Sequence, residues 1–401
     1  MFGLIEVLKK NGHDVVIFSI KSSRNKKSEY EEYFADPIGG EDKTYFEEYK
    51  KDFRTSLEIL DRQFYSRHVK KKLDKLIKYA KPDVAYLLHH QNRLSPSVID
   101  ACRENRVPVV MRISDFALVC TKNTLMREEK ICEECIDKSL FRGVVHKCVK
   151  DSYTGSLTKA IALYSYRTTK IYRKVERVVV PSQFTLDKIK FLFDESRMTY
   201  LPTFVMPIKK KTKRTANPGE YALFVGRIEE EKGLIYAIKA FEGLSYNFKI
   251  AGKSHSGYGK KLEKYVSDNK LKNIDFLGDV YGEELEKLYS NSRFMLIPSI
   301  WYENMPNVAL EAMSHGKPIV TSDLGSMKEI VVDNHNGLLF ESKNIDELKS
   351  RIKKLFTDDK LCIMLGKNAY KESKEKYNPE KHYNNLITIF REVKEGQNEY
   401  H

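Results

Sequence analysis

The chain has 401 residues, of which 70 are Lys or Arg and 56 are Asp or Glu, giving a formal net charge of +14. A hydrophobic content of 41% excludes a disordered or collagen-like protein, and no run approaches the roughly 18 apolar residues that a transmembrane helix needs. The N-terminal residues lack the features of a secretory signal, so we expect a cytoplasmic protein of two domains.

The positive charge is concentrated in the first half of the chain. Residues 1–200 contain 38 Lys and Arg against 28 Asp and Glu, and residues 201–219 add five basic residues in the run KKKTKR (209–214). Residues 220–401 contain 27 basic against 28 acidic residues, so the net charges of the three parts are +10, +5 and −1. A basic half suits an anionic partner, such as nucleic acid, anionic lipid or a phosphate-bearing substrate, and the alternative is a lysine-rich solvated surface.

Strand-like and helix-like segments alternate in the first half, which we assign to an N-terminal domain, residues 1–204. Helices are expected at 2–13 and 95–105, and strands at 14–20, 83–90, 107–114 and 176–182. A doubly wound domain normally opens with a strand whose turn leads into the first helix. No strand precedes residue 2, so we expect this domain to lack its first strand, because the chain is a fragment or its start is assigned late.

The second half repeats the alternation after a linker. Prolines, the basic run and an NPG turn mark residues 205–219 as this linker. Strands are then expected at 221–228, 247–252, 273–280, 293–300 and 317–323, with helices at 232–244 and 258–269. The C-terminal domain covers 220–377, and a helix in 378–401 is expected to pack back on the N-terminal domain. The alternation predicts an α/β protein with two Rossmann-like, doubly wound parallel sheets.

The segment GRIEEEKG (226–233) joins an expected strand to an expected helix. Gly226 provides the turn, and Arg227 and Lys232 place two cations just ahead of the helix. This arrangement suits a pyrophosphate, because the first N–H groups of a helix supply oriented donors. On its own, however, the segment is more simply explained by surface charges at the start of a helix.

A second element lies in WYENMPNVALEAMSHGKPIV (301–320). Glu303 follows an expected strand, Pro306 suits the first turn of the next helix, and Glu311 falls about two turns into it. The free N–H groups of residues 304–308 then suit phosphate or sugar oxygens. A carboxylate accepts from two vicinal hydroxyls, which makes Glu311 a candidate ribose ligand and Glu303 a candidate sugar ligand. The alternative role of both carboxylates is helix capping and ion pairing.

Together these motifs resemble the GT-B glycosyltransferases of family 4, also described as glycosyl transferases group 1. The resemblance rests on the E-x7-E spacing of Glu303 and Glu311, on GRIEEEKG, and on IAG (250–252), FLG (276–278) and GLLF (337–340). It implies a GT-B fold with a cleft between two Rossmann-like domains. It also implies retaining transfer of a sugar from a nucleotide-sugar donor to an acceptor hydroxyl, with no cofactor required for the chemistry.

The resemblance also implies roles for individual residues. Arg227 and Lys232 bind the diphosphate and form the catalytic set with Glu303, while Glu311 binds the ribose. Fixed cations and helix amides suit this task, because departure of a nucleoside diphosphate develops negative charge. The implied donor-binding set is Gly226, Arg227, Lys232, Gly252, Leu277, Glu303, Asn304, Met305, Pro306, Asn307, Val308 and Glu311.

The first half resembles the acceptor-side domain of one branch of this family, at SPS (95–97) and VPVVMRISDF (107–116). Many members have His-Asp where this chain has Ser114 and Asp115, and Ser114 cannot replace the imidazole that contacts the donor sugar. His89 and His90 end a nearby expected strand, where a place in the pocket wall or core is the simpler role. Ser114, Asp115 and His89 are therefore the acceptor-side candidates, and the family's glycine-rich loop after the first strand is missing.

Four of the six cysteines belong to an insert at 117–150, as Cys120, Cys132, Cys135 and Cys148. Their C-x11-C-x2-C-x12-C spacing fits a tetrahedral structural zinc site, with His146 as an alternative ligand. Reduced thiols without a metal, a disulfide and an iron–sulfur cluster are the other interpretations. We expect Cys102 and Cys362 to be packing residues.

The expected function is a step in cell-surface polysaccharide or glycolipid synthesis. A basic domain suits a saccharide or lipid-linked acceptor at an anionic membrane, and residues 156–177 combine apolar and basic faces that would contact lipid headgroups or pack in the core. The protein would be cytoplasmic, or peripheral at the inner face of the membrane, with no nucleic-acid partner. The alternatives are an epimerase or phosphorylase on the same fold, an inactive truncated transferase, and a nucleic-acid-binding protein with a zinc ribbon.

Overall fold

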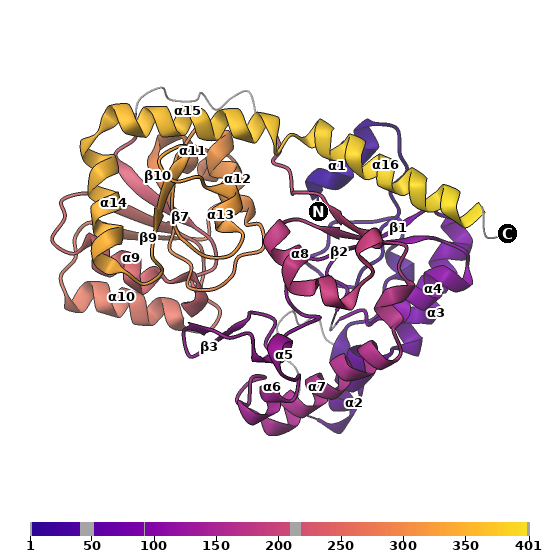
Figure 1. Ribbon diagram of the computed structural model, residues 1–401. Coiled ribbons are helices and arrows are strands. Elements are labelled where there is room, and N and C mark those ends of the chain that lie inside the picture. Colours follow the sequence, from indigo (N-terminus) through magenta and orange to yellow (C-terminus); the bar gives the residue numbers. More distant parts are fainter. Residues whose placement is uncertain (1, 41–51, 92, 209–217, 399–401) are drawn as a thin grey trace.

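The computed structural model describes residues 2–40, 52–91, 93–208 and 218–398, so the basic run at 209–214 lies outside the described residues (Figure 1). Two parallel β-sheets form the centres of two lobes, each with helices packed around it (Figure 1). The prediction of an α/β protein with two parallel sheets is confirmed, and the strand order reverses, as in a doubly wound sheet, in the C-terminal one. Across the described ranges, no helix combines the length and apolarity needed to cross a bilayer.

The N-terminal sheet has four parallel strands in the order β1-β2-β5-β6. These strands are β1 (Ala85–Leu87), β2 (Val109–Arg112), β5 (Arg177–Val180) and β6 (Met198–Tyr200). The two central strands are mostly buried, as their Val-rich sequences predict for a sheet covered on both faces. The main helices of this lobe are α1 (Phe2–Lys10), α2 (Phe53–Phe64), α3 (Arg67–Ala80), α4 (Ser97–Glu104), α7 (Tyr153–Thr168) and α8 (Gln183–Ile189).

The C-terminal sheet has six parallel strands in the order β12-β11-β10-β7-β8-β9. Its strands are β7 (Tyr221–Val225), β8 (Asn247–Ala251), β9 (Ile274–Gly278), β10 (Ser292–Ile297), β11 (Ile319–Ser322) and β12 (Gly337–Phe340). The chain winds outward from β7 to β9 and then returns to the other side of β7 with β10. The strand order therefore reverses between β7 and β10, which is where open parallel sheets bind ligands.

Helices cover both faces of the C-terminal sheet (Figure 1). They are α9 (Leu234–Phe241), α10 (Tyr258–Asp268), α11 (Gly282–Asn291), α12 (Asn307–Ser314), α13 (Met327–Ile330), α14 (Ile345–Thr357) and α15 (Asp359–Glu375). Two separate groups of buried apolar side chains, one on each face, show that the sheet is sandwiched between helices.

The strand expected at 14–20 does not form. These residues make one isolated bridge, between Ile20 and Ala35, and do not pair with β1, which is an edge strand of the described sheet. The prediction from the apolar pattern was wrong. A β-strand needs a neighbouring strand in register to bond its backbone, and an apolar run does not show whether that neighbour exists.

Two chain segments connect the lobes and lie side by side. One is the stretch 201–208 that leaves β6, and the other joins α15 to α16 (Pro379–Asn398). The amide of Val205 donates to the carbonyl of Tyr377 (3.0 Å), and the ring Nδ1 of His382 lies 2.8 Å from the carbonyl oxygen of Pro202. The two crossings are thus tied to each other by hydrogen bonds.

Helix α16 packs on the N-terminal lobe although it follows the C-terminal sheet in sequence (Figure 1). Its buried Leu386, Ile389 and Val393 share an apolar core with Val110 of β2 and Val179 of β5. The N-terminal sheet therefore depends on the last helix of the chain to cover one of its faces.

We expect Leu386→Ala to lower the free energy of unfolding by about 2–5 kcal/mol, because Leu386 is fully buried in this shared core. Urea unfolding followed by circular dichroism measures the change. Met364→Ala, at an exposed position of α15, is the control and should cost less than about 0.5 kcal/mol. Equal losses in the two variants would contradict the packing role of α16.

Candidate active site

Two loops meet where the strand order of the C-terminal sheet reverses. The loop after β7 carries Lys232, and the loop after β10 carries Glu303. Gly233 allows their close approach, since it has a left-handed φ of 66° and a Cβ there would lie 2.0 Å from the carbonyl oxygen of Pro298. Gly233, the last residue of the GRIEEEKG motif, thus allows the two loops to come together.

Lys232 and Glu303 form a buried ion pair between these loops. Nζ of Lys232 lies 2.7 Å from Oε1 of Glu303, and the same oxygen accepts from Ser299 Oγ (2.6 Å) and Trp301 Nε1 (3.0 Å). Burial raises the pKa of Glu303, but Lys232 and the two hydrogen bonds outweigh it, so the pKa lies below its ordinary value. Oε2 of Glu303 has no partner among the described residues, which leaves one carboxylate oxygen available to a ligand.

Arg227, the third residue of the predicted catalytic set, is more open. Its side chain is 56% exposed, and its Nη2 donates to Oε1 of Glu231 at 3.1 Å. Gly226 directly follows β7 and lies against Gly252, which directly follows β8: a Cβ on Gly252 would lie 1.8 Å from the carbonyl oxygen of Gly226. Two adjoining strand ends without side chains leave the backbone beside Arg227 open to a ligand.

Glu311 lies in the second turn of α12, as the sequence predicts. Its Oε2 accepts a hydrogen bond from the hydroxyl of Tyr289 (2.8 Å), and burial raises the pKa of Glu311. Tyr289 is itself buried and stacks on His315 with ring centroids 5.1 Å apart. The structure therefore gives Glu311 a fixed orientation, separate from the Lys232–Glu303 pair.

Asn304 and Met305, both predicted donor ligands, have different side-chain environments: Asn304 contacts the N-terminal lobe, whereas Met305 is buried in the core of the C-terminal lobe. Oδ1 of Asn304 accepts from Thr185 Oγ1 (2.7 Å), and its Nδ2 donates to the carbonyl of Ile113 (3.3 Å). Sδ of Met305 accepts from the amide of Thr203 (3.1 Å). The side chain of Asn304 therefore joins the lobes, which the sequence motifs did not reveal.

The other predicted donor ligands lie at the start of α12 and the end of β9. Pro306 caps α12, so Asn307 and Val308 lie in the first turn, where helix N–H groups lack acceptors within the helix. Leu277 is 37% exposed at the end of β9. All of them lie on the carboxyl-end side of the C-terminal sheet, together with Gly226 and Glu303.

The acceptor-side candidates lie where β1 and β2 end. Oδ1 of Asp115 accepts from the amide of Ala117 (2.9 Å), and Nη1 of Arg112 donates to Ser114 Oγ (3.4 Å). His89 has a left-handed φ of 47° and interacts electrostatically with Asp115. Burial lowers the pKa of His89 and outweighs the opposite effect of Asp115, so the imidazole is neutral at neutral pH.

His90 belongs to the core rather than to the cleft. It is 1% exposed, burial lowers its pKa to about 3, and its ring lies 5.7 Å from that of Tyr172. Neither ring nitrogen has a hydrogen-bond partner among the described residues. A buried, neutral histidine of this kind has a packing role.

The cysteine-rich insert crosses from the N-terminal lobe to the C-terminal lobe. Glu129, in the turn between β3 (Met126–Arg127) and β4 (Lys130–Ile131), accepts from the hydroxyl of Tyr236 (2.7 Å) and pairs with Lys343 (3.6 Å). Glu133 accepts from the hydroxyl of Tyr302 (2.8 Å). Since Tyr302 adjoins Glu303, the insert contacts the candidate donor site directly, which its spacing of cysteines did not predict.

The four predicted zinc ligands lie near one another, since Cys135 interacts with Cys120 and Cys148 interacts with both Cys135 and Cys132. The interaction with Cys120 is the main cause that lowers the pKa of Cys135 to about 6. His146, the alternative ligand, lies 3.2 Å from Oε2 of Glu134. No set of three or more His, Cys, Asp or Glu side chains in the described chain is placed to hold a metal ion, so zinc stays a prediction for metal analysis. Cys102 and Cys362 are buried packing residues, as expected.

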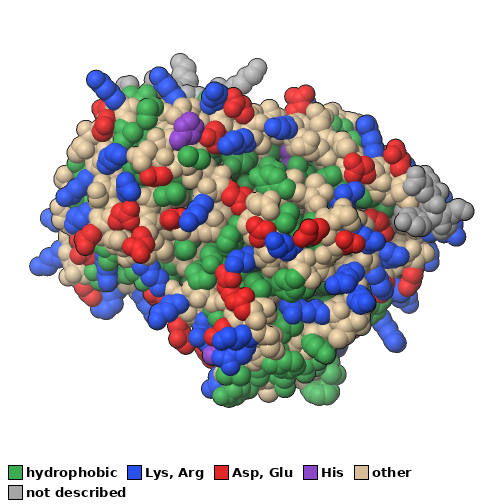
Figure 2. Space-filling view, in the orientation of Figure 1, with side chains coloured by type: hydrophobic (Ala, Val, Ile, Leu, Met, Phe, Trp, Pro, Cys, Tyr) green, Lys and Arg blue, Asp and Glu red, His purple; other side chains and the backbone are tan. Residues whose placement is uncertain are grey.

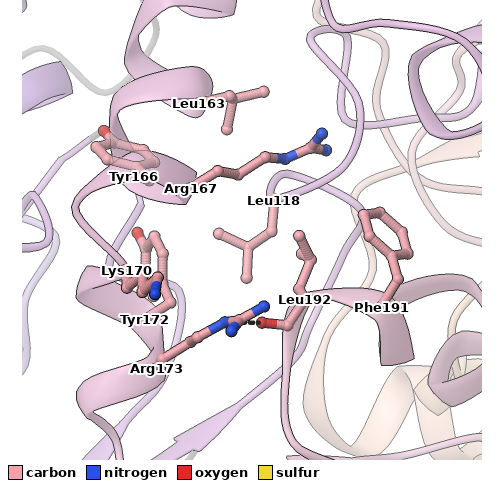
Figure 3. Close-up of a pocket in the computed structure, with 9 residues that line it drawn as sticks. All are labelled: Leu118, Leu163, Tyr166, Arg167, Lys170, Tyr172, Arg173, Phe191 and Leu192. Atoms are coloured by element: carbon pink, nitrogen blue, oxygen red, sulfur yellow. Dashed lines mark hydrogen bonds between the residues drawn. The ribbon is translucent and has the colours of Figure 1, made fainter.

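A separate pocket opens in the N-terminal lobe, at the C-terminal end of α7 (Figure 3). Its volume is about 160 Å³. Arg167 extends across it, with its guanidinium 5.4 Å from the ring of Phe191, and its Nε and Nη2 have no partner among the described residues. The pocket is lined by Leu118, Leu163, Tyr166, Arg167, Lys170, Tyr172, Arg173, Phe191 and Leu192. None of these belongs to the predicted donor site.

Comparison with known sequences identifies the C-terminal lobe. Residues 206–372 match the family described as glycosyl transferases group 1. This part of the chain is similar to glycosyl transferases group 1 domains. An uncharacterized glycosyltransferase of Methanocaldococcus jannaschii is 34% identical over 179 residues, which are 44% of this chain and 50% of that protein. An N-acetyl-D-galactosaminyltransferase of Campylobacter jejuni is 26% identical over 233 residues, 53% of this chain and 61% of its own. The chain spans about half the length of the curated relatives it matches.

Solved structures extend the likeness of the group 1 domain to the whole fold. Sucrose-phosphate synthase of Thermosynechococcus elongatus superposes with a TM-score of 0.68 at 17% identity, over 97% of this chain and 91% of that one. HepE of Anabaena, in complex with UDP and glucose, gives a TM-score of 0.59 at 16% identity, over 80% and 81% of the two chains. The predicted GT-B fold is confirmed by these neighbours.

We expect Glu303→Gln to remove a pH-dependent part of the stability. The folded-state pKa of Glu303 lies below its ordinary value of 4.5, so the carboxylate contributes stability that is present above about pH 4.5 and lost as the pH falls through the folded pKa. Urea unfolding between about pH 3 and 7 should show the wild-type advantage shrinking in acid. Glu263→Gln, at an exposed position of α10, is the control, and a pH-independent difference for Glu303→Gln would refute the ion-pair assignment.

Proposed function

We propose that the protein is a retaining glycosyltransferase of family 4 that moves a hexosyl group from a nucleotide-sugar to an acceptor hydroxyl. The observation that carries the proposal is the buried Lys232–Glu303 pair, placed at the strand-order reversal of a group 1 domain with one carboxylate oxygen free. The complex of HepE with UDP and glucose supports a nucleotide-sugar donor, since it shares the fold.

Lys232 and Arg227 are suited to the departing diphosphate. An ammonium has three N–H donors, so Lys232 can keep its bond to Glu303 and still donate to a phosphate oxygen. Arg227 is exposed enough to reach the other phosphate, and the first-turn amides of α12 add oriented dipoles. These fixed positive groups lower the barrier because negative charge develops on the diphosphate as the glycosidic bond breaks.

The two carboxylates are suited to the two sugars of the donor. Oε2 of Glu303, with no partner among the described residues, can accept from hydroxyls of the transferred sugar. Glu311, oriented by Tyr289, can accept from the ribose hydroxyls. On the acceptor side, Asp115 and the neutral His89 are the groups available to position the acceptor hydroxyl and take its proton.

We place this reaction in cell-surface polysaccharide or glycolipid synthesis, in the cytoplasm or at the inner face of the membrane. The Campylobacter relative, whose name gives an undecaprenol-linked acceptor, supports a saccharide or lipid-linked acceptor. The basic first half of the chain fits such an acceptor. The match of residues 206–372 to glycosyl transferases group 1 favours a transferase over the zinc-ribbon alternative.

A donor-binding assay tests the proposal. We expect at least one UDP-, GDP- or ADP-sugar to raise the thermal midpoint of the wild-type protein, because a bound ligand stabilises the folded state. Lys232→Ala and Glu311→Ala should lose this shift, and Lys232→Ala should lower transfer by about 100-fold or more.

Lys272→Ala is the matched control, since this lysine is exposed in the same lobe and away from the cleft. It should keep both the shift and the activity. The proposal fails if no nucleotide-sugar stabilises the wild-type protein, or if the control and Lys232→Ala behave alike.

A further inference from the structure

Exposed hydrophobic side chains gather at one end of the N-terminal lobe. Seventeen large hydrophobic side chains are exposed among the described residues, and nine of them lie on α2, α7 and α6 (Arg142–Val145) or at the end of α6. Single exposed apolar residues are ordinary, but such a cluster marks a binding surface. We call it the apolar tip: Phe53, Leu57, Leu60, Phe141, Val145, Tyr153, Leu157, Ile161 and Tyr164.

Helix α7 is apolar on two sides. Ala160 and Leu163 are buried, while Leu157, Ile161 and Tyr164 form a stripe with exposed fractions of 41%, 42% and 55%. The spacing of three and four residues places this stripe on one helix face. The sequence left open whether this segment packs in the core or contacts lipid. In the structure, one face of α7 packs in the core and the opposite apolar face is exposed.

The neighbouring helices extend the stripe into a continuous surface. The ring of Phe141, beside α6, lies 6.4 Å from that of Tyr164. Helix α2 packs against α7 and presents Phe53, Leu57 and Leu60 at the same helical spacing. Figure 2 shows hydrophobic side chains covering the lower end of the molecule, where Figure 1 places α6, α7 and α2.

The segment that carries α6 and α7 is strongly basic, whereas α2 has Arg54 and Arg62 balanced by Glu58 and Asp61. Residues 138–174 contain nine Lys and Arg and one acidic residue, Asp151. Lys138, Lys147 and Lys170 are exposed, and the ammonium of Lys147 lies 4.5 Å above the ring of Tyr153. Aromatic and aliphatic side chains beside snorkelling lysines are the pattern of a helix that lies in a membrane interface.

We propose that the apolar tip docks on an anionic lipid bilayer, with its stripes at the level of the headgroups and the surrounding lysines on lipid phosphates. The positive charge of residues 138–174 favours an anionic bilayer over a second copy of the chain as the partner of the apolar tip. A two-fold dimer through the tip would place the same basic segment against itself, whereas an anionic bilayer neutralises it.

Membrane docking also suits the proposed function. The docking proposal rests on that function only for the location of the acceptor. The apolar tip and the acceptor-side residues belong to the same lobe, and the insert that carries α6 also contacts Tyr302 beside the donor site. Docking therefore holds the cleft near the bilayer surface without any membrane-spanning helix in the described chain.

Co-sedimentation of the full chain with vesicles, without any nucleotide-sugar, tests the docking. We expect binding to vesicles of phosphatidylcholine with about one third phosphatidylglycerol, little binding to phosphatidylcholine alone, and release by salt as the charges are screened. Leu157→Ser with Ile161→Ser, and separately Lys138→Glu with Lys147→Glu, should each weaken the partition by about tenfold or more.

The matched controls are Val332→Ser with Met364→Ser for the apolar change, and Lys260→Glu with Lys272→Glu for the charge change, all at exposed positions of the C-terminal lobe. Unchanged thermal midpoints, and unchanged stabilisation by nucleotide-sugar, would show that the tip variants fold and keep the donor site. The docking proposal is overturned if the wild-type protein ignores anionic vesicles or if tip and control variants bind equally. It is also overturned if the stripe variant turns a dimer into a monomer while vesicle binding persists.

Discussion

The buried ion pair between Lys232 and Glu303 is the interaction on which the rest of the cleft depends. Removing either partner would leave an uncompensated charge in the protein interior, so the loops after β7 and β10 must meet. The pair also fixes the residues on either side of Glu303. Tyr302 and Asn304 then point to the other lobe and bind the insert and the end of β2. One electrostatic constraint within the C-terminal lobe therefore also shapes the surface that faces the N-terminal lobe.

Local patterns predicted much of this arrangement. Strand–helix alternation gave the parallel sheet of the C-terminal lobe, and the turn GRIEEEKG placed Lys232 beside the strand-order reversal. Glu311 also lies in the expected turn of α12, because helical spacing is set by the backbone alone. These predictions succeeded since each depends on neighbours in sequence or on a rule of sheet topology.

Contacts between distant segments were not predictable in the same way. The side chain of Asn304 joins the lobes through Thr185, which lies more than 100 residues away in the sequence. The strand expected at 14–20 is absent because an apolar run does not supply its own hydrogen-bonding neighbour. The position of the insert across the cleft likewise depends on Tyr236 and Tyr302, which no local motif connects with Glu129 or Glu133.

The paired crossings between the lobes have a mechanical consequence. The stretch 201–208 and the start of α16 are hydrogen-bonded to each other. Both chain connections between the lobes therefore lie at the same place and form one hinge. The insert joins the lobes at a second place, through the contacts of Glu129 with Lys343 and of Glu133 with Tyr302. These contacts hold the lobes together away from the hinge. Separating the lobes would therefore exchange the polar contacts of the insert for water and would also remove Tyr302 from the rings of Phe116 and Phe184, against which it packs.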